Sequence, residues 1–126
     1  MTGQDFIGEL AVITGVLSKH EWTGQSQPFA LTLRTMAEDS ARWIESGWVS
    51  PAGISTPIER AIVVLCQDMI VLLGYGAQAG IQHEELHKLA TCAIAATAAG
   101  VIVDPTHVAY FTDPESPLHA ILSDED

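Results

Sequence analysis

The feature of this sequence that most constrains its fold is the segment 61–73, which reads Ala-Ile-Val-Val-Leu-Cys-Gln-Asp-Met-Ile-Val-Leu-Leu. Directly before it, Thr56, Pro57 and Glu59 combine a capping box with a proline in the first turn, a pattern typical of a helix start. A helix that is apolar almost all the way round has to be covered on more than one side. We therefore expect a helix over about residues 57–73, placed centrally or shared with a second copy of the chain.

Three further segments carry helical spacing, over about residues 4–19, 27–46 and 82–99. In the first of them, apolar residues recur every three or four positions and predict one buried stripe: Phe6, Leu10, Ile13 and Leu17. Cap and stop signals set the expected ends: Thr2 with Asp5, Ser26, Gly47 and Gly100.

An apolar arm, residues 101–126, follows the fourth helix and should pack back on the helices or across onto a partner. The sequence thus predicts one all-α domain over residues 1–126, a four-helix bundle-like fold with a C-terminal arm, which forms a homodimer. The residues expected to face the second copy are Ile62, Leu65, Met69, Leu72 and Leu73.

Charge and composition narrow the function classes. The chain has 16 acidic and 5 basic residues and a formal charge of −11, so we expect neither nucleic acid nor an anionic membrane as a partner. Cys66 and Cys92 lie in apolar helical stretches and do not predict a disulfide framework. The segment 61–73 is interrupted by Gln67-Asp68 and is too short to cross a bilayer, so a cytoplasmic location is expected.

The sequence His83-Glu84-Glu85-Leu86-His87 matches HExxH, in which two histidines one helical turn apart can share a zinc ion. In this respect it resembles the zincin metalloproteases, where the glutamate beside the first histidine, here Glu84, is the general base. Asp104 or His107 would have to supply a third ligand. Because the helix is expected to begin at the motif, ordinary helix-terminal histidines are favoured over a looser metal or pH-sensitive role shared with His20.

Asp68 is the second candidate, because it is the one acidic residue within 61–73. On a helical projection it lies on an apolar flank, near Val64 and Leu72. A carboxylate buried there needs a partner or takes up a proton. The expected partners are Arg34, Arg42 or a histidine of the fourth helix, and the simplest interpretation is a structural ion pair or a half-exposed position.

The apolar third helix, the Glu-Glu-Leu-x-x-Leu-Ala opening at 84–90 and the alanine-rich fourth helix resemble the MazG-type all-α nucleotide pyrophosphohydrolases, over residues 56–100. In that family an EExxE signature and further acids on the next helix hold magnesium against a nucleoside triphosphate. Here the EExxE position falls on 67–71, which keeps only Asp68. The resemblance implies the fold and a dimer, and it leaves Asp68, Glu84 and Glu85 as the residues of any remaining activity.

The leading hypothesis from the sequence is a non-catalytic helical homodimer that acts by binding another protein, because no catalytic set is complete. One alternative is Mg²⁺-dependent nucleoside triphosphate hydrolysis at Asp68, Glu84 and Glu85. A second alternative is zinc binding by His83 and His87. Carboxylates that converge would favour the hydrolase, whereas dispersed carboxylates leave the protein-binding hypothesis.

Overall fold

The computed structural model describes residues 1–24, 27–45, 57–81 and 83–122. Within these residues all regular structure is helical, which confirms the predicted all-α class. The predicted helix caps at Ser26 and Thr56 and the predicted stop at Gly47 lie outside the described residues. The helices are α1 (Gly3–Ser18), α2 (Gln27–Glu45), α3 (Pro57–Gln78), α4 (Glu84–Ala98), α5 (Pro105–Thr112) and α6 (Leu118–Leu122).

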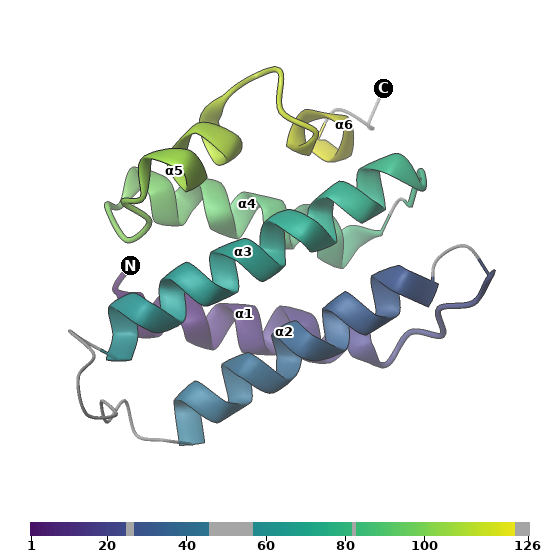
Figure 1. Ribbon diagram of the computed structural model, residues 1–126, viewed down its shortest axis with the longest axis horizontal. Coiled ribbons are helices and arrows are strands. Elements are labelled where there is room, and N and C mark those ends of the chain that lie inside the picture. Colours follow the sequence, from purple (N-terminus) through teal and green to yellow (C-terminus); the bar gives the residue numbers. More distant parts are fainter. Residues whose placement is uncertain (25–26, 46–56, 82, 123–126) are drawn as a thin grey trace.

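Helix α3 lies between the other helices (Figure 1). In that view α1 and α2 lie on one side of it and α4, α5 and α6 on the other, and α3 contacts each of them. Its residues Leu65, Met69 and Leu72 are completely buried. The side chains of all six helices meet in one hydrophobic cluster around α3, as expected for a helix with an apolar circumference.

Helix α1 has the boundaries and the buried face that its sequence predicts. The Thr2 N–H donates to Asp5 Oδ2 at 3.0 Å, and the Asp5 N–H donates to Thr2 Oγ1 at 3.1 Å, so the capping box is formed. The buried stripe consists of the four predicted residues together with Ile7 and Thr14. The spacing of the apolar residues therefore identifies the face of α1 that joins the core.

Helix α3 is longer than predicted, because it runs through Gly74 and Gly76 to Gln78. Gly76 has a packing role: a Cβ there would lie 3.2 Å from Leu86 Cδ1 and 3.3 Å from Phe29 Cε2. The helix is closed instead by Gly80, whose φ is +67°. The Gly80 N–H donates to Ala77 O at 3.2 Å and the Ile81 N–H to Gly76 O at 2.9 Å, which is a Schellman ending.

The extra length of α3 also corrects an expectation about membranes. The helical stretch Ile58–Gln78, 21 residues, is long and apolar enough to cross a bilayer by length and composition. The shorter segment 61–73 by itself is too short to cross a bilayer. In the structure this stretch packs against every other helix, and its residues Leu65 to Leu73 supply much of the core.

The described part of the C-terminal arm, residues 101–122, packs back onto the chain's own helices. It contains α5 and α6, which the sequence analysis did not identify, and Phe111, Leu118 and Ile121 are buried against the core. The Tyr110 hydroxyl donates to Ile70 O of α3 at 3.5 Å. Helix α4 ends at Ala98, and the predicted stop residue Gly100 follows it with a φ of +78°. The arm therefore starts from a fixed turn and covers part of α3.

Two glycines of similar sequence position should respond in opposite ways to alanine. Gly80→Ala places a Cβ on a left-handed residue and should lower the free energy of unfolding by about 1 kcal/mol. Gly74→Ala lies in the helix interior, where an added Cβ meets no atom within 4 Å, and should raise that free energy by about 0.5–1 kcal/mol. Urea denaturation of the two variants measures both changes. Equal destabilisation by both would show that α3 does not extend through Gly74.

Candidate functional site

The most unusual polar group of the described residues is the carboxyl of Asp68, on the side of α3 that faces α2. The residue is only half-buried, but its Oδ2 atom is buried and has no hydrogen-bond partner within the described residues. The neighbouring positions Ala61 and Leu72 are completely buried. The apolar flank predicted for Asp68 is therefore present, and it is a place where a bare negative charge is costly.

The residue facing Asp68 is a second acid, Asp39 of α2. Burial raises the pKa of Asp68 to about 7, and the neighbouring carboxyl of Asp39 acts in the same direction. Arg42 lowers the pKa of Asp68, but by less. Of the partners predicted for Asp68, Arg42 is the one that affects its pKa. The hydrogen bond of Arg42 is made to Asp39.

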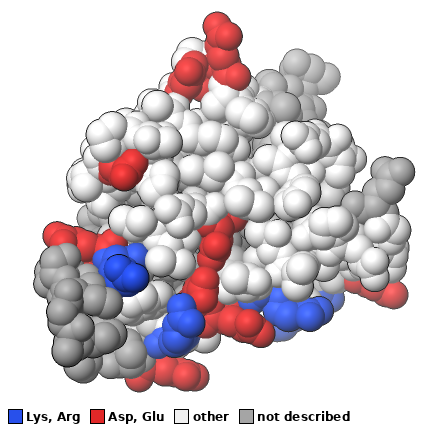
Figure 2. Space-filling model, in the orientation of Figure 1, with Lys and Arg blue, Asp and Glu red and all other residues white. Residues whose placement is uncertain are grey.

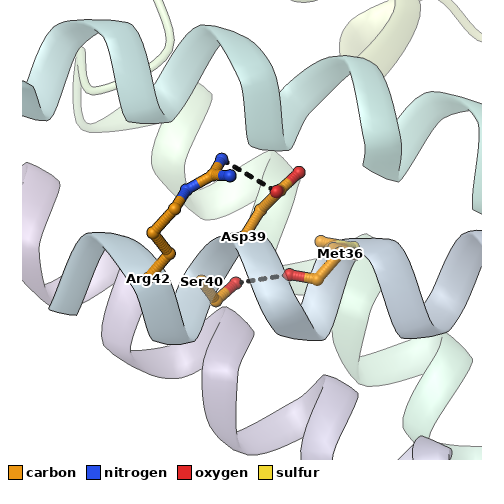
Figure 3. A network of polar contacts seen from close by, with 4 residues as sticks. All are labelled: Met36, Asp39, Ser40 and Arg42. Atoms are coloured by element: carbon orange, nitrogen blue, oxygen red, sulfur yellow. Dashed lines mark hydrogen bonds and ion pairs between the residues drawn. The ribbon is translucent and has the colours of Figure 1, made fainter. Parts of the chain in front are cut away.

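Figure 3 shows how α2 arranges these groups. The Arg42 guanidinium donates to Asp39 Oδ1 at 2.9 Å, one helical turn away. The Asp39 side chain is 14% exposed, whereas that of Arg42 is 66% exposed. The hydroxyl of Ser40 donates to Met36 O at 3.0 Å, so it serves its own helix. Arg42 therefore pairs with Asp39, and the carboxyl of the two acids whose pKa is raised is that of Asp68.

Asp39 was missed by the sequence analysis, although a signal was present. The residues at Met36, Ser40 and Trp43 are buried, and Asp39 lies beside this stripe at the edge that meets α3. Arg42 lies four residues after Glu38 and three after Asp39, both spacings that allow an ion pair on a helix, and the structure pairs it with Asp39. A carboxylate at the edge of a buried stripe is the pattern that would have identified it.

The HExxH histidines do not lie together on one face of α4. His83 precedes the helix as its N-cap residue, with φ −145° and ψ 135°, and its Nδ1 accepts the Glu85 N–H at 3.1 Å. His87 is exposed and lines a groove between α1 and α4. The two histidines therefore differ in role, since His83 caps the helix and His87 faces solvent.

The two side chains proposed as a third zinc ligand, Asp104 and His107, serve the start of helix α5 or are buried. Asp104 is the N-cap of α5, with Oδ1 accepting the N–H groups of Thr106 at 2.9 Å and His107 at 3.3 Å. His107 is buried. Among the described residues no three His, Cys, Asp or Glu side chains are placed to hold a metal ion.

His83 belongs to an aromatic cluster that joins the ends of three helices. Its ring centroid lies 5.2 Å from that of His20 and 6.1 Å from that of Trp22, and Trp22 in turn lies 4.5 Å from Phe29. The Trp22 Nε1–H donates to Leu17 O at 3.1 Å. His20 thus lies against one histidine of the motif, His83, and the cluster connects the end of α1 to the starts of α2 and α4.

The acids proposed for magnesium binding are dispersed. Asp68 meets Asp39 and Arg42 between α2 and α3. Glu85, at the start of α4, forms an ion pair with Lys88 at 2.9 Å, and Glu84 beside it is exposed. The described residues thus do not bring Asp68, Glu84 and Glu85 together as the ligand set that Mg²⁺ needs.

The five residues predicted to face a second copy are core residues of the chain itself. Each is at most 8% exposed, because α1, α2 and α4 already cover that side of α3: Ile62, Leu65, Met69, Leu72 and Leu73. That interface prediction is wrong. The outer side of α3 carries a different set of apolar residues, Val63, Val71 and Tyr75, which are exposed.

Comparison with known protein families, with curated proteins and with solved structures finds no match for this chain. The resemblance to the MazG-type pyrophosphohydrolases therefore rests on the sequence pattern alone. The chemistry of the chain has to be inferred from its own residues.

The proton held by Asp68 predicts how stability depends on pH. The unfolded chain releases it near the ordinary pKa of 3.8 and the folded chain near 7, so the folded state binds more protons in between. The free energy of unfolding should fall as pH rises from about 4 to about 7, and then level off. Asp68→Asn cannot ionise, so it should match the wild type at pH 4 and exceed it at pH 8. We expect on the order of 1 kcal/mol, because solvent screens the half-exposed pair.

Glu38→Gln is the matched control, since it removes one negative charge from an exposed position of α2 next to Asp39. Chemical denaturation of both variants between pH 4 and pH 8 separates the effect of the pair from that of net charge. A pH profile of Asp68→Asn that parallels the wild type would show that the two carboxyls do not share a proton.

Proposed function

We propose that this chain is a non-catalytic helical homodimer that acts by binding another protein through an apolar surface on α3 and the arm. The observation that carries the proposal is a ridge on the outer side of α3, with Val63, Val71 and Tyr75 exposed and Gln67 between them. Residues four apart form one ridge of a helix and fit between the side chains of a second helix. We call this ridge the α3 ridge.

The surface beside the α3 ridge supports the proposal. Val103, in the turn before α5, is 75% exposed, and a groove of about 990 Å³ lies between α3 and residues 101–107. In Figure 2 the face that carries α3, α5 and α6 is largely free of charged side chains. The charged side chains in that view gather along α2 and at the edges. Exposed apolar side chains on a face with few charged side chains are typical of a protein-binding surface.

The charge of the chain limits the kind of partner. At −11 the molecule repels nucleic acid and anionic lipid, whereas an apolar protein surface meets little charge at the α3 ridge. The proposal takes α1 to α4 as a bundle-like core and a cytoplasmic location for the chain. The hydrolase and zinc alternatives rank below it, because neither is supported by three ligands brought together among the described residues.

A charge on the α3 ridge should abolish partner binding. Val71→Glu replaces an exposed apolar side chain, so the fold should tolerate it while the desolvated contact is lost. Proteins captured by the tagged wild-type chain from a lysate of its source cells should be at least about tenfold depleted with Val71→Glu. Leu31→Glu, at an exposed apolar position of α2, should capture them as the wild type does.

Two results would count against the proposal. Capture of the same proteins by all three chains would place the binding surface elsewhere. Release of pyrophosphate from a nucleoside triphosphate with Mg²⁺ by the wild type, and its loss in Asp68→Asn, would show that the chain is an enzyme.

A further inference from the structure

A second surface, separate from the α3 ridge, lies between α1 and α4. It is an open groove of about 930 Å³, and it shares no lining residue with the groove beside the α3 ridge. Its floor is apolar, with Ile13 of α1 and Cys92 of α4 both buried. The Cys92 thiol donates to Glu9 Oε2 at 3.5 Å, so the one buried polar group of the floor is already partnered.

Large apolar side chains on α1 stand exposed at this groove and beside it. Val12 is 68% exposed, and Val16, one turn further along α1, is 45% exposed. Met1, which lines the groove at its other end, is also exposed. Nothing among the described residues covers these side chains, although α1 buries its opposite side completely. Solvent-exposed valines in a row on a core helix favour a partner surface.

Two glycines of α1 lie where a second chain can pack closely against the helix. Gly8 and Gly15 lie in the interior of α1, seven residues apart and so on one face, with Val12 between them. An added Cβ at either one would meet no atom within 4 Å. Glycine is unfavourable inside a helix, and here the chain's own packing does not require it. A glycine lets a second backbone approach α1 more closely than any residue with a side chain does.

The charges around the groove suit a second copy of this chain. The acids Asp5 and Glu9 belong to α1, and the base Lys88, which is 55% exposed and also pairs with Glu85 of its own helix, belongs to α4. A two-fold axis that crosses the groove between Glu9 and Lys88 exchanges their positions, so each acid meets the base of the other copy. This match is notable in a molecule that otherwise carries few basic residues and a charge of −11.

We infer that two copies of this chain associate through the α1–α4 groove around a two-fold axis, with the exposed face of α1 against the other copy. The inference rests on the proposed function, which takes the chain as a homodimer. It assigns the dimer to a surface other than the predicted one and leaves the α3 ridge for the partner protein.

The oligomeric state of the full chain tests this assignment. In light scattering at micromolar concentration the wild type should have twice the chain mass of 13.5 kDa, and Val12→Arg should have the mass of one chain. Leu31→Arg, equally exposed at 63% but on α2, should stay dimeric. Circular dichroism of each variant confirms that the helices are retained.

The outcomes separate the inference from the proposed function. A dimer that survives Val12→Arg but is lost in Val71→Glu would overturn the inference and keep the homodimer, placed at the α3 ridge. A wild-type chain that is monomeric would overturn the homodimer itself, and the inference with it.

A charge exchange gives a readout that misfolding does not imitate. Glu9→Lys places a lysine opposite Lys88 of the second copy and should weaken dimerisation at least tenfold, even though it lowers the net negative charge. Adding Lys88→Glu to the same chain restores opposite charges across the axis and should restore the dimer. Unchanged dimerisation in Glu9→Lys, or no recovery in the double variant, would overturn the inference.

Discussion

The apolar circumference of α3 has to be kept from water, and the rest of the chain is arranged to do so. Helices α1, α2 and α4 cover the side that carries Leu65, Met69 and Leu72, and the arm covers part of the remainder through Tyr110 and Phe111. Burial of this many large side chains is the main favourable term in folding. What is left uncovered is the α3 ridge, so the same constraint that builds the core also defines the surface proposed for a partner.

The polar groups that suggested chemistry have structural roles at the seams between helices. Asp39 and Asp68 meet where α2 packs on α3, with Arg42 paired to Asp39 and the pKa of Asp68 raised toward neutrality. His83 caps α4 and packs its ring on His20. Each group supports one contact between helices, and among the described residues none of them belongs to a set of three side chains that could hold a metal ion. The proposed function therefore rests on surfaces, the α3 ridge and the α1–α4 groove.

Local signals predicted the local structure. The capping box at Thr2 and the stop at Gly100 act within one turn of the chain, and both are found where the sequence places them. Helix α3 was predicted to end near residue 73 because helix propensity is local, whereas the packing role of Gly76 inside the helix depends on Phe29 and Leu86, which are distant in sequence. Helix α2 covers one side of α3. This packing brings Asp39 to Asp68 and helps to bury the residues expected at an interface. Periodicity shows that a side is apolar but not what covers it.

Helix α3 is the core helix of this chain and packs against every other described helix, even though it is long and apolar enough to cross a membrane. Amide hydrogen exchange on the full chain in detergent-free buffer measures this most directly. Amides of residues 65–73 should exchange more slowly than those of any other helix, because their opening requires the core to unfold. Exchange there as fast as in the short helix α6, or a chain that stays in solution only with detergent, would contradict the claim.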